Sequence, residues 1–196
     1  MRISEESHPA LTRPANASWT DACRESTEGS YSGAAGFSSR TAILWVYKFP
    51  KKYVDVLPIH LLEAVAELVN LAMTGPAIAG ESAVAWCDNT SWVQSVRHAK
   101  PKDQRLRHLL AVRQNLEKRF NTTVHSAYVN TKRNVVADLA SRGDVEEAFA
   151  ELGRSGWPRD QVRFIDLNKN PELGPPDMVQ LLDTLRRETL AKNLHR

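Results

Sequence analysis

The sequence predicts an α/β protein in which helices flank a mixed β-sheet. Three short strand-like stretches lie near its start, and an apolar stripe of helical period follows them. Residues 82–87 are then almost all apolar, which is typical of a strand buried on both faces and implies parallel neighbours. A length of 196 residues suits one domain of about 140 to 150 residues with an extension.

The predicted strands are short and are bounded by turn-forming residues. Residues 17–23 form the first, and a polar stretch at 24–32 separates it from the second, at 33–37. Residues 42–47 (AILWVY) are rich in β-formers and follow a four-residue turn. Two later stretches complete a five-stranded mixed sheet, at 82–87 and 123–129.

The predicted helices are placed by apolar period and by end signals. Pro58 suits a first turn, apolar residues recur from Leu61 to Met73, and Gly75-Pro76 ends this helix. Lys100-Pro101-Lys102 separates two further helices. Those two helices and the last one give the element order βββαβααβα and cover residues 90–98, 104–120 and 134–141.

The chain divides into three parts by composition. Residues 1–16 are polar with two prolines and are expected to form a flexible arm, and residues 17–142 hold the predicted domain. Residues 143–196 form an extension with a short amphipathic helix, a candidate strand at 162–167, a loop with three prolines and a helical tail from Met178. This extension is either a linker or an addition that packs on the domain.

Composition excludes several classes of protein. Hydrophobic residues make up 42 % and charged residues 25 %, and no apolar run approaches the roughly 18 residues of a membrane span, so we expect no membrane partner. Cys23 and Cys87 are too few for a disulfide framework or a cysteine-based zinc site. We therefore expect an intracellular protein, of the cytoplasm or nucleus, in which any metal is held mainly by carboxylates.

Four carboxylates occupy comparable places in the predicted architecture. Asp21 lies in the first strand and Asp88 ends the fourth, and these strands are expected to be neighbours. Glu63 in the first long helix and Asp138 in the last helix can join them. Because four converging acids repel one another, the cluster predicts a divalent cation, and oxygen ligands suit Mg²⁺ or Mn²⁺.

The segments around these acids form an ordered set of motifs. They are TDA at 20–22, LEAVA at 62–66, CDNT at 87–90 and NVVADLASR at 134–142. In this order they resemble the ribonuclease H domain of retrotransposon polyproteins, of the gypsy-like and tyrosine-recombinase types. The resemblance covers residues 17–142 and implies a ribonuclease H-like fold.

The resemblance also implies an activity. Asp21, Glu63, Asp88 and Asp138 match the four carboxylates that bind two Mg²⁺ ions in that family, which hydrolyses the RNA strand of RNA–DNA hybrids. The partners that it implies are an RNA–DNA hybrid and other parts of a retroelement polyprotein, including reverse transcriptase. One departure is clear: the family has a histidine and a Pro-Gly loop before its last Asp, whereas residues 128–133 here read YVNTKR. His125 is the nearby substitute, with an ordinary, partly exposed strand residue as the alternative. Because the family histidine is missing, the activity is expected to be reduced.

Three of the four carboxylates have an alternative explanation. Glu67 lies one turn beyond Glu63 on a similar helix face, although Glu63 fits the phase of the motif. Asp88 could cap the following helix, and Asp138 could be a first-turn acid that the helix dipole favours.

A basic stretch predicts contact with nucleic acid. Eight Lys or Arg and two acidic residues lie between Arg97 and Arg119, although a solvated helix face would look the same. The residues expected to contact phosphates without reading sequence are Arg97, Lys100, Lys102, Arg105 and Arg107. Asn89 and Asn134 are candidates for positioning the nucleic acid, with turn or cap roles as the alternative.

The sequence therefore predicts a metal-dependent endoribonuclease of the ribonuclease H type. The first alternative is a catalytically weak domain that acts as a nucleic-acid-binding or interaction module. The second is a DNA-cutting enzyme of the same superfamily, in which the site usually holds three acids.

Overall fold

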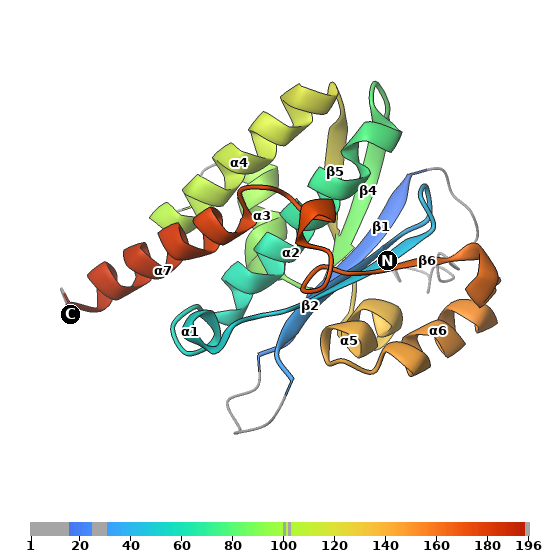
Figure 1. Ribbon diagram of the computed structural model, residues 1–196. Helices are drawn as coiled ribbons and strands as arrows, with labels where there is room; N and C mark the ends of the chain where they lie inside the picture. The colour runs from blue at the N-terminus through green and yellow to red at the C-terminus, as the bar shows by residue number, and fades with distance from the viewer. Residues whose placement is uncertain (1–15, 25–30, 100, 102, 195–196) are drawn as a thin grey trace, which may run out of the picture.

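A computed structural model describes residues 16–24, 31–99, 101 and 103–194 of the chain. Within these residues six strands form one mixed sheet in the order β5-β4-β1-β2-β3-β6 (Figure 1). The strands are β1 (Ala17–Ala22), β2 (Gly33–Ser38), β3 (Ile43–Lys48), β4 (Ser82–Cys87), β5 (Thr123–Tyr128) and β6 (Arg163–Asp166). The predicted α/β class is confirmed, and so is the order βββαβααβα up to residue 141, apart from one short additional helix after β3.

Helices cover both faces of the sheet (Figure 1). The short helix α1 (Lys51–Val54) was not predicted. The others are α2 (Ile59–Thr74), α3 (Thr90–His98), α4 (Gln104–Phe120), α5 (Val135–Ser141), α6 (Val145–Arg154) and α7 (Met178–Leu194). α5 and α6 pack on one face, and α1, α2, α3, α4 and α7 contribute to the core on the other.

Alternation along the strands separates the two cores. Successive side chains of a strand point to opposite faces. On β3, Trp45 and Tyr47 join the core beneath α2, while Leu44 and Val46 join the core beneath α5 and α6. β3 is therefore apolar on both sides, as its sequence ILWVYK requires.

The pairing of the strands brings two predicted site residues together. β1 is antiparallel to β2 and parallel to β4, and Trp19 lies opposite Trp86. Because parallel strands end at the same edge of a sheet, Asp21 near the end of β1 and Asp88 just after β4 share that edge. The neighbouring first and fourth strands that the sequence predicts are thus confirmed.

α2 is the central helix of the larger core. Leu61, Leu62 and Ala66 are fully buried in it. The segment Ile59–Ile78 has a mean hydropathy of 1.3 and is, among the described residues, long and apolar enough to cross a membrane, contrary to the prediction that no such run exists. Its most apolar window is 72 % buried inside the protein, which is the setting of a core helix.

The extension after residue 142 packs on the domain. β6 continues the sheet parallel to β3, with Phe164 opposite Leu44, and Leu182 and Leu185 of α7 are fully buried in the larger core. The predicted sheet of five strands is therefore wrong by one strand. β6 was missed as a sheet member because it has four residues, of which Arg163 and Phe164 are exposed.

Candidate metal centre

Three of the four predicted carboxylates come together at one edge of the sheet. One oxygen each of Asp21, Glu63 and Asp88 lies within 4.8 Å of the others. Asp21 comes from the middle of the sheet, Asp88 directly follows β4, and Glu63 lies on α2, which packs across β1. Asp21 is buried, and Glu63 and Asp88 are half-buried.

Hydrogen bonds position each acid in a different way. Ser141 Oγ donates to Asp21 Oδ2 at 2.5 Å, and Thr131 Oγ1 donates to Asp88 Oδ2 at 2.7 Å. The second oxygen of Asp88, Oδ1, is buried and has no hydrogen-bond partner among the described residues. An unpartnered carboxylate oxygen at a cluster of acids is suited to accept a cation.

Burial, and after it mutual repulsion, changes the acidity of the cluster. Burial, together with the nearby charges of Asp88 and Asp138, raises the pKa of Asp21 to about 7, while the hydrogen bond from Ser141 acts in the opposite direction. Burial and the charges of Asp88 and Asp21 raise the pKa of Glu63 to about 8. Without a cation, the cluster therefore keeps protons that ordinary carboxylic acids lose well below neutrality.

The fourth acid, Asp138, stands apart from this set. It lies in the first turn of α5, close enough to raise the pKa of Asp21 by its charge. Its Oδ1 accepts hydrogen bonds from Arg142 Nε at 3.1 Å and Nη2 at 3.0 Å, one helical turn further on. The structure thus places Asp138 beside the cluster but in an ion pair with Arg142.

The donor set fits a hard divalent cation. Its three ligands are carboxylate oxygens, which Mg²⁺ and Mn²⁺ prefer over the nitrogen and sulfur ligands typical of zinc. The unpartnered Oδ1 of Asp88 and the raised pKa values of Asp21 and Glu63 show that the negative charge is incompletely neutralised by the protein itself. Asp21, Glu63 and Asp88 are therefore the residues that could hold the ion.

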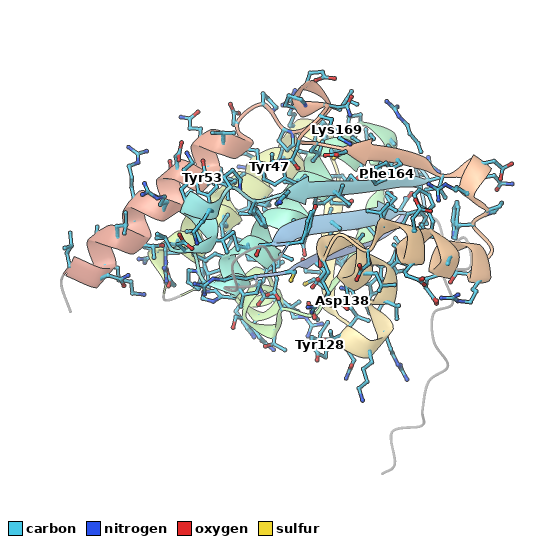
Figure 2. The ribbon with its side chains drawn as sticks, turned by 60° about the horizontal axis from the view of Figure 1, so that its bottom comes forward. Tyr47, Tyr53, Tyr128, Asp138, Phe164 and Lys169 are labelled. Carbon is cyan, nitrogen blue, oxygen red and sulfur yellow. The ribbon has the colours of Figure 1, made fainter. Side chains whose placement is uncertain are left out.

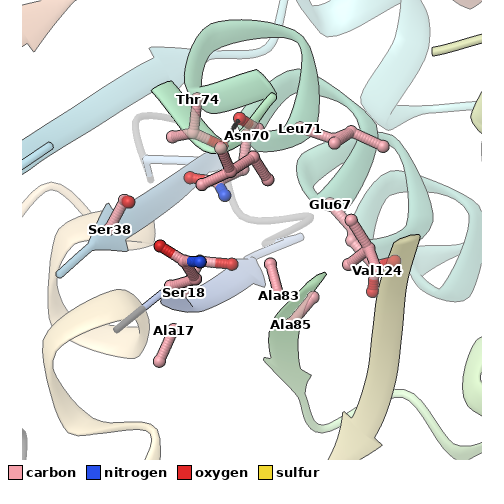
Figure 3. A pocket seen from close by; sticks show the side chains of 12 residues that line it. Ala17, Ser18, Ser38, Glu67, Asn70, Leu71, Thr74, Ala83, Ala85 and Val124 are labelled. Carbon is pink, nitrogen blue, oxygen red and sulfur yellow. Dashed lines mark hydrogen bonds between the residues drawn. The ribbon is translucent and has the colours of Figure 1, made fainter. Parts of the chain in front are cut away.

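Glu67 is excluded as the helical ligand because other residues bind its carboxylate. It is 1 % exposed and forms an ion pair at 3.3 Å with Arg113 of α4 and a hydrogen bond at 2.6 Å with Ser126 of β5. It also lines a cavity of about 10 Å³ beneath α2, with Asn70, Thr74 and Ser38 (Figure 3). Glu67 is thus part of the polar interior of the fold.

Asn89, rather than Asp88, caps helix α3. The Asn89 side chain accepts a hydrogen bond from Trp92 N at 2.9 Å and donates one to His60 O at 2.7 Å. It is 4 % exposed, so the structure shows the cap role that the sequence left open, and its contact with nucleic acid stays a prediction. Its capping role leaves Asp88 free to face the cluster.

Asn134 joins the two halves of the site. Its Nδ2 donates to Thr20 O at 2.9 Å, which ties the start of α5 to the residue before Asp21. It is 1 % exposed, and its contact with nucleic acid stays a prediction. On β2, a Cβ at Gly33 would lie 3.0 Å from Ser141 O, so the absence of a side chain there permits the close approach of α5.

The predicted basic residues lie in different structural settings. Arg105 is 7 % exposed and its guanidinium binds Asp103 and Thr189 of α7, so it holds the extension in place and is not a phosphate ligand. Arg97 and Arg107 are exposed, and their contact with nucleic acid stays a prediction. Lys100 and Lys102 lie outside the described residues.

His125 is remote from the cluster. It is exposed on β5 opposite Val84, which precedes Asp88 by four residues, or about 13 Å along the sheet. It therefore does not stand in for a histidine beside the carboxylates.

Comparison with known proteins adds little to this geometry. No family model matches the chain, and no curated protein does. Solved structures that resemble it include RNase H1 from Halobacterium salinarum NRC-1, with 13 % identity and a TM-score of 0.47, and LC11-RNase H1, isolated from compost by a metagenomic approach, with 16 % identity and a TM-score of 0.41. Each likeness covers 67 % of this chain and 96 % of the other. The observed order of strands and helices agrees with the ribonuclease H-like fold that the sequence predicts.

Proposed function

We propose that the chain is a metal-dependent endonuclease that hydrolyses the RNA strand of RNA–DNA hybrids. The observation that carries this proposal is the meeting of Asp21, Glu63 and Asp88, with Asp88 Oδ1 buried and unpartnered. Such a site suits phosphodiester hydrolysis, because bound divalent ions polarise the scissile phosphate and lower the pKa of the attacking water. The ordered motifs supply the choice of RNA–DNA hybrid as substrate.

The residues of the chain have distinct roles in this proposal. Asp21, Glu63 and Asp88 hold Mg²⁺, and Asp21 and Glu63 release their protons when the cation binds. Ser141 fixes Asp21, and Thr131 fixes Asp88. Asp138 would be the fourth carboxylate available to hold metal if it left Arg142. The retroelement polyprotein context and its partners rest on the motifs alone.

Asp138 gives a reason to keep a second candidate. Its ion pair with Arg142 leaves a set of three acids, as in DNA-cutting enzymes of the same superfamily. The two candidates differ in substrate, and one assay therefore separates them.

The test uses the full chain with labelled RNA–DNA hybrid, DNA duplex and RNA duplex in the presence of Mg²⁺. Cleavage of the hybrid alone is expected, and it should disappear with EDTA and in Asp88→Asn. Asp55→Asn is the matched control because Asp55 is an exposed acid of α1's end that contacts Lys51. Cleavage of DNA duplex would favour the second candidate. Hybrid binding without cleavage would identify a binding module, and equal cleavage by Asp88→Asn would exclude the assigned site.

A further inference from the structure

The loop between β5 and α5 borders the carboxylate cluster. Tyr128, the last residue of β5 before the loop, lies opposite Cys87, which directly precedes Asp88. Thr131, in the middle of the loop, donates its hydroxyl hydrogen bond to Asp88. Side chains of this loop therefore lie next to the atoms that would hold the metal.

Hydrogen bonds give the loop a fixed shape. Asn130 accepts twice: its side chain from Lys132 N at 3.0 Å and its carbonyl from Arg133 N at 2.7 Å. At the start of the loop, Val129 N donates to Cys87 O at 3.0 Å. At its end, Asn134 N donates to Thr131 O at 3.0 Å. Residues Thr131–Arg133 thus form one 3₁₀ turn, which presents its side chains in a defined direction.

This loop exposes an aromatic ring and two cations. Tyr128 ends the edge strand β5 and is 47 % exposed. Lys132 and Arg133 are exposed, and neither has an ion-pair partner in the described part of the chain. Arg105, Arg113 and Arg142, by contrast, are all paired with carboxylates. Figure 2 shows Tyr128 and Asp138 on the same side of the molecule.

The combination matches the chemistry of a single nucleic-acid strand. Cations without acidic partners attract backbone phosphates, and an exposed aromatic ring can stack on a base. A base inside a duplex already has both faces covered by its neighbours, so Tyr128 can stack only on an unpaired base. The loop is therefore suited to bind the junction between a hybrid duplex and a single strand.

We propose that Tyr128, Lys132 and Arg133 form a subsite for an unpaired nucleotide beside the scissile phosphate, so that the chain favours hybrids with a single-stranded extension. This inference rests on the proposed function, since it names the form of hybrid that the same site takes. Tyr128 stacks on the unpaired base, and Lys132 and Arg133 hold the phosphates that flank it.

Fluorescence anisotropy with fluorescein-labelled hybrids tests the subsite. Binding is measured at pH 7 in EDTA, which prevents cleavage, with a blunt hybrid and with one whose RNA strand extends beyond the DNA. The unaltered chain should bind the extended hybrid about tenfold more tightly, which is the usual effect of one stacked base. Tyr128→Ala should lose this preference, and Tyr128→Phe should keep it because the ring remains.

Salt dependence tests the two cations. The double variant Lys132→Ala/Arg133→Ala should lower the slope of log Kd against log salt by about 1.4 to 1.8, because each phosphate contact contributes about 0.7 to 0.9. Arg163→Ala/Arg187→Ala is the control for equal loss of charge, since both residues are exposed and Arg163 begins β6, at the sheet edge opposite the cluster. Its slope should stay unchanged.

Three outcomes would overturn the subsite. Equal affinity of the unaltered chain for the two hybrids would exclude stacking by Tyr128, and an unchanged slope in the Lys132→Ala/Arg133→Ala variant would exclude its phosphate contacts. If the unaltered chain cleaves hybrids in Mg²⁺ while these variants bind normally, the subsite fails and the proposed function stands. If it neither binds nor cleaves any hybrid, both fail together.

Discussion

Asp21→Asn is expected to stabilise the metal-free protein. An aspartate in the unfolded chain has its ordinary pKa of 3.8, whereas in the folded chain the pKa of Asp21 is raised to about 7. Between these values the unfolded state loses its proton while the folded state keeps it, so stability falls as the pH rises. Above pH 7 the folded state must also carry the charge, and the loss reaches its full size.

The size of the effect follows from the two pKa values. Their difference corresponds to about 4 kcal/mol at pH 8, where Asp21 is charged in both states. Asparagine removes the charge but weakens the hydrogen bond with Ser141, at a cost of about 1 kcal/mol. The expected net gain is about 3 kcal/mol at pH 8. It falls to nearly zero at pH 4.5, where the pKa difference contributes only about 1 kcal/mol.

Urea denaturation followed by tryptophan fluorescence measures this difference. Both proteins are unfolded in EDTA at pH 8 and at pH 4.5, with Asp55→Asn as the control for loss of an exposed acid, expected to change stability by less than about 1 kcal/mol. Saturating Mg²⁺ should stabilise the unaltered chain, by about 2.7 kcal/mol at one hundred times its Kd, and should leave Asp21→Asn unaffected. Equal stability of the two proteins at pH 8 in EDTA would refute the reasoning.

Three further predictions concern the charges around the cluster. Binding of Mg²⁺ at pH 7 should release about one and a half protons, about half of one from Asp21 and most of one from Glu63. Calorimetry in buffers of different ionisation heat measures this number. A release near zero would contradict the raised pKa values. Arg142→Gln should free Asp138 from its ion pair and tighten Mn²⁺ binding about two- to fivefold by titration calorimetry, the range expected for a partly exposed pair; unchanged affinity would mean that Arg142 does not compete for Asp138. Arg113→Met should lower the free energy of unfolding, measured by urea denaturation, by about 3 to 5 kcal/mol because it leaves Glu67 buried without its ion pair. Glu67→Gln in the same chain should restore part of the loss. A loss below about 1 kcal/mol would show that Glu67 is neutral without Arg113.

The sequence was sufficient to predict most of the sheet and the meeting of three acids. Strong local signals account for this, such as the apolar run at 82–87 and the Gly75-Pro76 stop after α2. Asp21 and Asp88 follow from strand order, because both lie at the carboxyl ends of parallel neighbours. Their position depends on the backbone alone, which local sequence largely determines.

The missed features depend on contacts between distant segments. β6 is a short strand with an exposed start, and it is stabilised by pairing with β3 rather than by its own apolar pattern. Arg105 belongs to a basic stretch in the sequence, yet it is buried because Thr189, 84 residues later, accepts its hydrogen bond. No local pattern distinguishes such an arginine from one that faces solvent.

Glu63 and Glu67 show the same limit within one helix. They lie one turn apart on a similar face of α2, so helical period alone cannot separate a metal ligand from a structural acid. Their neighbours separate them: Glu63 lies at the end of the sheet with Asp21 and Asp88, whereas Glu67 lies one turn deeper beside Arg113. Arg113 neutralises Glu67 inside the protein, whereas Glu63 keeps a charge that only a cation or a proton can balance. The position of the acids and the position of the basic side chains therefore define the site together.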